Sequence, residues 1–234
     1  FVLPAPNTEE GHSVMDLANW SARPRPARAP LEGRYVRLEP LEHEHADTLY
    51  QAASAEGAED RFRWLFESAP QNRAEFDAWI ATASASTDPL FFAVIDKETG
   101  RAEGRQALMR IDQTHGVIEI GSIMWGPALQ QTRMATEALF LFADHIFALG
   151  YRRFEWKCND LNAPSKRAAL RFGFRPEGVF RQHMVVKSAN RDTAWFAMTD
   201  QDWQHLRPIY ETWLSPDNFD TSGRQVRRLE ECRL

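Results

Sequence analysis

The fold is decided by residues 126–138, which read Gly126-Pro127-Ala128-Leu129-Gln130-Gln131-Thr132-Arg133-Met134-Ala135-Thr136-Glu137-Ala138. The run before them, 117–125, is rich in β-branched and aromatic residues and is typical of a strand. After them, apolar residues recur every three or four positions until Gly150, which predicts a long helix. The first backbone N–H groups of such a helix have no partner within the helix. The loop is therefore a candidate anion site.

A second unit of the same kind follows directly. Residues 153–159 alternate between apolar and polar side chains, which predicts a strand, and 162–172 predict a short helix that Gly173 ends. The long helix between the two strands has the right length for a crossover connection. We therefore expect the strand at 153–159 to lie parallel to the strand at 117–125.

The order of these motifs resembles the GNAT acyl-CoA-dependent N-acetyltransferases, over about residues 33–203. Gln130, Arg133 and Ala135 occupy the three defined positions of their phosphate loop, Gln/Arg-x-x-Gly-x-Gly/Ala, and their later Asn-x-x-Ser and Gly-Phe motifs are matched at 162–165 and 173–174. The sequence looks most similar to the branch named for ribosomal-protein alanine acetyltransferases (RimJ/RimL-like). The resemblance implies acetyl-CoA as acyl donor, bound by Met124, Trp125, Gln130, Gln131, Thr132, Arg133, Met134, Ala135, Thr136, Asn159, Asn162 and Ser165.

Arg133 departs from the family pattern, which usually has glycine at this position. Glycine lets the backbone approach a pyrophosphate without a Cβ in the way. An arginine with helical φ can instead offer its guanidinium to a phosphate as a charged fork. The alternative is that Arg133 is a solvated residue on the first helical turn, and the sequence leaves both open.

Two residues are candidates for the acyl-transfer chemistry. Glu119 is the only charged residue in 117–124, and a carboxylate among apolar neighbours suits a general base if its face of the sheet is covered. The family often uses a tyrosine as acid one turn before the closing glycine, but Ala169 stands there. Ser165 is then the remaining candidate to assist the leaving thiolate. The alternatives are that Glu119 faces solvent and that Ser165 only helps to cap its helix.

The acceptor side is less well marked. By resemblance, the aromatic segment 60–66 lines the acceptor pocket, with Arg61, Phe62, Trp64 and Phe66 as candidate substrate contacts. His183, on a later strand, is a further candidate to reach the substrate, although a lone histidine is more often structural. The alternative is an ordinary core patch beneath a loop. Cys158 lies on the apolar side of its strand without a histidine partner in a motif, which disfavours a nucleophilic cysteine.

The remaining sequence predicts a single α+β domain. Strands are expected at 35–41, 90–95 and 104–111 and helices at 43–53 and 73–83, with two later strands, 179–187 and 193–199, joined by a turn at 189–192. The result is a GNAT-like mixed, mostly antiparallel central sheet flanked by helices. We expect an extended Pro/Arg-rich arm at 1–32, the acetyltransferase domain at 33–203, and a C-terminal helix with a polar tail at 204–234. That tail is either loose or bound to another subunit.

Composition and net charge limit the classes of partner that the protein is expected to bind. The net charge of −5 is compatible with an amine substrate and gives no strong nucleic-acid signal. No apolar run approaches a membrane span, two cysteines form no disulfide framework, and no cluster has metal-ligand spacing. We therefore expect a cytoplasmic enzyme without a metal, acting on the N-terminus of a ribosomal or other protein or on a small amine. A homodimer is one arrangement that the arm would allow.

Two other functions stay open at this point. Arg133 and Ala169 leave room for a non-catalytic acyl-CoA-binding protein of the same fold. Arg23, Arg25 and Arg28 in the arm are the only feature that favours an RNA- or ribosome-associated interaction domain.

Overall fold

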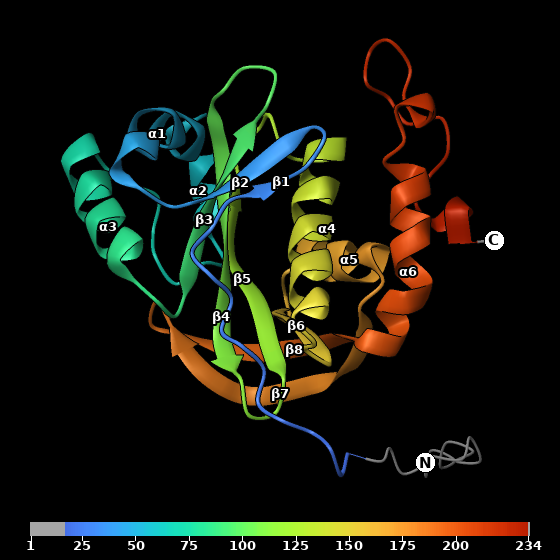
Figure 1. Cartoon of the computed structure of the whole chain (residues 1–234). Helices are drawn as coiled ribbons and strands as arrows, with labels where there is room; N and C mark the ends of the chain where they lie inside the picture. The colour runs from blue at the N-terminus through green and yellow to red at the C-terminus, as the bar shows by residue number, and fades with distance from the viewer. Residues whose placement is uncertain (1–16, 234) are drawn as a thin grey trace, which may run out of the picture.

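Eight strands form one sheet in the computed structural model, which describes residues 17–233 (Figure 1). Their order across the sheet is β1-β2-β3-β4-β5-β6-β8-β7. The pair β5–β6 is parallel and the other neighbours are antiparallel, as the sequence predicts. The bounds are β1 Leu31–Glu32, β2 Val36–Pro40, β3 Leu90–Asp96, β4 Ala102–Asp112, β5 Val117–Trp125, β6 Arg153–Asn159, β7 Arg175–Val186 and β8 Ala189–Thr199.

Helices cover both faces of this sheet, and the mixed α+β fold class is confirmed. One side carries α1 (Ala46–Ser54, after the 3-10 turn His43–His45), α2 (Ala58–Phe62) and α3 (Arg73–Ala85). The other side carries α4 (Arg133–Ala148), α5 (Ala163–Phe172) and α6 (Asp200–Trp213) (Figure 1). Each face has its own apolar cluster, one around Phe142 and Ile120 and the other around Phe76 and Ile80. Burial of these two clusters is the main stabilising contribution.

The sheet opens between its two parallel strands. β5 and β6 pair only from Val117↔Arg153 to Ile120↔Trp156, although β5 continues to Trp125 and β6 to Asn159. β5 also carries a bulge, because Ser122 has a left-handed φ of 51° where the β4–β5 register shifts. A bulge bends its strand and re-aims the side chains that follow. Beyond Ile120 the two strands therefore diverge, and the gap connects the two faces of the sheet.

The predicted turn at 189–192 is wrong. β7 and β8 are joined instead at Lys187 and Ser188, whose φ angles of 49° and 60° suit a two-residue hairpin turn. Arg191 lies within β8, opposite Met184 of β7. Asn-Arg-Asp is a stronger turn signal than Lys-Ser, and sheet pairing overrides it here.

The described part of the N-terminal arm packs along the domain's flank. The indole N–H of Trp20 donates to the Thr114 carbonyl at 2.7 Å, and Arg23 stacks on Trp20 at 4.1 Å. Arg25 donates to the Thr87 carbonyl at 2.6 Å, and Arg28 pairs with Glu42 at 2.7 Å. Arg25 and Arg28 are thus engaged with the domain itself, whereas Arg23 stacks on Trp20 within the arm. Residues 1–16 of the predicted arm lie outside the described residues.

The polar tail, which the sequence suggests is loose or bound to a partner, packs on its own domain. After α6 the chain forms short 3-10 turns at Pro216–Asn218 and Glu230–Arg233. Leu229 is completely buried, and Asn218 donates to the Trp213 carbonyl at 3.0 Å. The tail thereby covers the end of α6. Among the helices at 17–233, none has the length and apolarity needed to cross a membrane.

Candidate active site

A cleft of about 900 Å³, which we call the carrier cleft, lies at the N-terminus of α4. The N-cap residue Thr132 donates its hydroxyl to the Leu129 carbonyl at 2.7 Å, makes no side-chain cap bond, and is followed by no acidic residue in the first turn. The first N–H groups of the helix are therefore left without a capping side chain. Gln131, Thr132, Arg133, Met134, Ala135 and Thr136 all line this cleft, and their arrangement suits a phosphate-bearing carrier.

The loop before α4 is held in place by one of its own side chains, that of Gln130. The Gln130 amide donates to the Trp125 carbonyl at 2.9 Å, and Gln131 takes a left-handed φ of 61°. Gln130 itself lines the second cleft described below. This bond ties the start of the loop to the end of β5.

Arg133 lies at the rim of the carrier cleft. Its guanidinium contacts aromatic rings and forms no salt bridge with residues 17–233. Its guanidinium stacks on the Tyr35 ring at 4.2 Å and lies 5.2 Å from the Phe219 ring of the tail. A guanidinium stacked by its face keeps its N–H edge available to an anion. Arg133 is therefore half-buried beside the helix N-terminus and not fully solvated.

A second cleft, of about 740 Å³, lies across the gap between β5 and β6, and we call it the acceptor cleft. It shares Trp125 and Ala168 with the carrier cleft. Ile120 and Trp156 belong to the apolar cluster on the α4–α6 side. Because strand side chains alternate, Glu119 and Lys157 point to the other face. The two clefts thus approach one another through the sheet.

Glu119 is 3% exposed and lines the acceptor cleft, so it does not face solvent. Its Oε2 accepts from Arg110 Nη1 at 2.7 Å and from Lys157 Nζ at 2.9 Å. The expectation of a carboxylate among apolar neighbours only is wrong, because two cations compensate its charge. Its candidacy as a base now depends on its position in the cleft.

Ser165 lies on the opposite side of the gap, at the start of α5. The Asn162 side chain caps the helix by accepting from the Ser165 N–H at 3.1 Å, so Ser165 is not the cap residue. Its Oγ accepts from Trp156 Nε1 at 3.0 Å. The Asn159 side chain accepts from the Leu161 N–H at 3.0 Å. These bonds leave the hydroxyl proton of Ser165 for the neighbouring Cys158 sulfur or for another acceptor in the cleft.

Cys158 is buried next to this hydroxyl. Burial raises the pKa of its thiol, and a hydrogen bond with Ser165 opposes that shift only in part. A raised pKa keeps the thiol protonated near neutral pH, so Cys158 is a poor nucleophile. Ala169, at the position of the family's tyrosine, is fully buried.

The predicted acceptor contacts divide into three groups. Trp64, Phe66 and Arg61 line the acceptor cleft. The guanidinium of Arg61, however, donates hydrogen bonds to backbone carbonyls after α1, including that of Glu56 at 2.8 Å. The prediction for Phe62 is corrected: it is 4% exposed and belongs to the core under α1–α3. His183 is also not among the cleft residues, and its Nδ1 bonds Thr193 Oγ1 at 2.9 Å.

Sequence reasoning missed four cations of the acceptor cleft, Arg63, Arg110, Lys157 and Arg191. A signal existed for Lys157, because Arg153, Glu155 and Lys157 alternate with three apolar residues and so share one face of β6. Arg110 sits at a bulge of β4 with a φ of 48°. Arg191 was missed because a turn, and not a strand, was predicted at 189–192.

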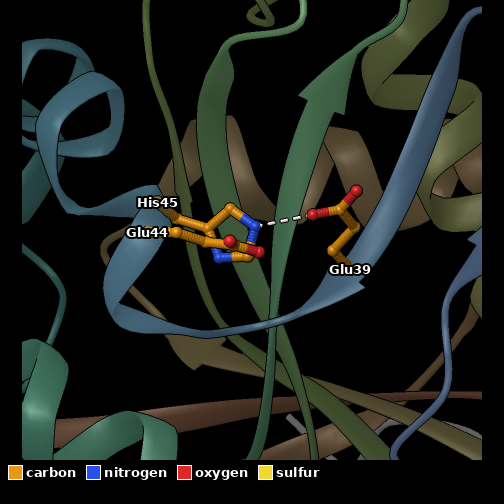
Figure 2. Close-up of side chains that lie close together, drawn as sticks. All are labelled: Glu39, Glu44 and His45. Atoms are coloured by element: carbon orange, nitrogen blue, oxygen red, sulfur yellow. Dashed lines mark hydrogen bonds and ion pairs between the residues drawn. The ribbon is translucent and has the colours of Figure 1, made fainter.

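A cluster of Glu39, Glu44 and His45 has the spacing of a metal site (Figure 2). His45 Nδ1, however, accepts from the Glu42 N–H at 3.0 Å, and Nε2 bonds Glu39 at 2.7 Å. Both ring nitrogens are therefore engaged in joining β2 to the turn before α1. Glu39 and His45 thus form a structural hydrogen-bonded pair, with the exposed Glu44 beside them.

Comparisons with known proteins agree with this geometry. Residues 36–175 match the model of the acetyltransferase (GNAT) domain family. The chain is similar to the crystal structure of a GCN5-related N-acetyltransferase from Brucella melitensis, with 59% identity over 93% of this chain and 99% of that one and a TM-score of 0.91. It is also similar to a GNAT-family protein from Chromobacterium violaceum, with 38% identity, 83% and 98% coverage, and a TM-score of 0.76.

A more distant neighbour shares the fold alone. It is an acetyltransferase from Salmonella typhimurium that modifies the N-terminal serine of a 50S ribosomal subunit protein, with 18% identity, 71% and 96% coverage and a TM-score of 0.62. A comparison with curated protein sequences gave no match.

Proposed function

Because this chain belongs to the GNAT acetyltransferase family, we propose that it transfers an acetyl group directly from acetyl-CoA to an amine. The observation that carries the proposal is the pair of clefts that meet through the gap between β5 and β6. One cleft ends at an uncapped helix N-terminus and the other at a buried carboxylate. The donor and the acceptor would thus reach the same point from opposite faces.

The N-terminal turn of α4 would hold the carrier's phosphates. The N–H groups of residues 133–135 have no acceptor within the helix, these residues line the carrier cleft, and Arg133 would add a cation at its rim. Trp125 and Ala168 line both clefts and would flank the arm that carries the thioester. Holding the two reactants in place is itself a large part of the rate enhancement.

Glu119 would accept the proton of the acceptor's ammonium group, directly or through a water molecule. Ser165 would donate to the departing thiolate from the α5 side, with Trp156 orienting its hydroxyl. We expect Ser165→Ala to reduce turnover less than Glu119→Gln, because water can also protonate a thiolate.

The acceptor is a protein N-terminus, as in the RimJ/RimL-like branch, or a small amine, and we place the enzyme in the cytoplasm. The non-catalytic alternative is motivated by Ala169. The RNA-associated alternative is weakened, because two of the three arm arginines, Arg25 and Arg28, bind the domain.

The test combines binding with turnover. Saturating acetyl-CoA should raise the melting temperature, since a ligand at about 100 Kd stabilises by about 2.7 kcal/mol. Release of free thiol with a panel of peptides and small amines should then identify the acceptor. An unchanged melting temperature contradicts carrier binding, and a shift without thiol release from any amine supports the non-catalytic alternative.

A further inference from the structure

Arg191 is a buried cation without an anionic partner among residues 17–233. Its side chain emerges from β8 into the acceptor cleft, and the residue is 8% exposed. Its Nε donates to Thr193 Oγ1 at 3.2 Å, and its guanidinium lies 5.1 Å from the Phe66 ring. The two terminal nitrogens, which form the fork of the guanidinium, have no protein acceptor in the described chain.

The charges beside Arg191 are already balanced by one another. Arg110 and Lys157 pair with Glu119, Lys157 also pairs with Glu155, and Arg153 joins Glu155 to Glu177. This chain of ion pairs holds three cations and three carboxylates. Arg191 is an additional positive charge beside it.

The other acid in the interior of the cleft does not compensate Arg191 either. Glu67 pairs with Arg105, which is 1% exposed and also donates to Ser122 Oγ at 2.7 Å. Asp60 is exposed on α2, at the mouth of the cleft. Burial lowers the pKa of Arg191, with Cys158, Glu119 and Arg110 as the neighbouring groups that also affect it, yet an arginine stays charged at neutral pH.

A buried, uncompensated charge is destabilising unless a ligand supplies its partner. The guanidinium fork matches the two oxygens of a carboxylate. Glu119 in the same cleft offers an acceptor for an ammonium group, and Trp64 and Phe66 add aromatic surface to the cleft lining.

We propose that Arg191 binds the carboxylate of the acceptor, which is therefore a small amino acid-like amine with an apolar body. This inference rests on the proposed acetyl transfer and names its substrate class. The ammonium group is placed at Glu119 and the carboxylate at Arg191. An amine without the anionic group would leave Arg191 desolvated and unpaired, and so would bind more weakly.

The first experiment compares matched acceptors by free-thiol release with acetyl-CoA. The twenty L-amino acids are screened, and each hit is compared with its amide and with the amine that lacks the carboxyl group, for example L-phenylalanine, L-phenylalaninamide and 2-phenylethylamine. The free acid should have a kcat/KM at least about 10-fold higher, and Arg191→Gln should remove that preference while leaving the amide unaffected. Arg181→Gln, on the exposed face of β7, is the matched control and should behave as wild type.

The second experiment is independent of turnover. Calorimetric titration of the CoA-bound protein with the same acids and amides should show binding of a free acid that Arg191→Gln abolishes. The melting temperature of Arg191→Gln should equal or exceed that of wild type, because an uncompensated charge is removed.

Failure of the inference is distinguishable from failure of the proposed function. Thiol release that is equal for acids and amides, or that prefers peptides or uncharged amines, overturns the role of Arg191 while acetyl transfer stands. No binding of any free acid in the panel also overturns it, as does a lower melting temperature of Arg191→Gln with unchanged acid affinity, which identifies a structural role.

Discussion

The two clefts differ in how their chemistry is assembled. The carrier cleft takes its proposed phosphate-binding groups from one continuous stretch, 131–136, mainly backbone N–H groups at the start of α4, while other segments, including the C-terminal tail, complete its lining. The acceptor cleft takes charged side chains from β4, β5, β6 and β8 and adds aromatic residues from the segment after α2. Backbone groups survive most substitutions, whereas a network of side chains depends on each member. The acceptor side should therefore be the more sensitive of the two.

The sharpest test of this difference is Glu119→Gln, with Glu155→Gln as its matched control. Both residues are buried and both lose an ion pair with Lys157, but only Glu119 lines the cleft. Glu119→Gln should reduce kcat roughly 10²–10⁴-fold with little change in carrier affinity, and its residual rate should recover towards high pH as free amine accumulates. Equal effects of the two variants on kcat would mean that the ion pairs, and not proton transfer, are responsible.

Phe62 and Phe66 separate the core from the cleft wall. Phe62→Ala should lower the free energy of unfolding by about 3–5 kcal/mol, because a buried ring leaves a cavity. Phe66 is 49% exposed, so Phe66→Ala should change stability little and should raise KM for the acceptor. Chemical denaturation and steady-state kinetics of the two variants check this, and a raised KM for a stably folded Phe62→Ala would return Phe62 to the acceptor site.

On the carrier side we expect a smaller effect. Arg133→Gly should weaken acetyl-CoA binding about 10-fold and reduce the salt dependence of that affinity, because one charged hydrogen bond to phosphate is lost. Arg207→Gln on α6, which removes an exposed cation paired with Asp144, is the control for general charge. An affinity and salt slope equal to wild type would show that Arg133 serves only to stack on Tyr35.

The smallest effect concerns Cys158. The folded protein's thiol pKa lies above its ordinary value because of burial, so the reactive thiolate should be scarce at pH 7 and increase as the pH rises towards that pKa. In a Cys232→Ala background, alkylation by iodoacetamide should be slow at pH 7 and accelerate as the pH is raised. Cys158→Ala should retain turnover. Rapid alkylation at pH 7 would reopen a role for the thiol.

Buried acids show the limit of single-residue reasoning in this chain. Glu119 and Glu137 are 3% and 4% exposed, but sequence reasoning singled out only Glu119. Glu137 accepts backbone N–H bonds from Arg34, Tyr35 and Val36 at 2.6–2.8 Å and ties α4 to β2. The periodicity of α4 shows neither the strand beside it nor the groups that satisfy this carboxylate. A buried acid therefore does not by itself identify catalysis.

Local patterns by themselves determined most of the architecture. Alternation and helical periodicity placed β5, α4, β6 and α5 nearly to the residue, because these patterns depend only on which face of an element is buried. The loop before α4 was equally readable, since an uncapped helix N-terminus is a local property. The continuous carrier site follows from it.

Only the tertiary structure decided what surrounds each charge. In the folded chain, Lys157 and Arg110 pair with Glu119, and Arg191 lies within a strand and lines the acceptor cleft. Phe62 belongs to the core, and the C-terminal tail lines the carrier cleft. These outcomes depend on the register between strands far apart in the sequence and on a bulge at Ser122. The electrostatic energy of a charged side chain depends on its neighbours in space, and the order of residues along one strand does not reveal which neighbours these are.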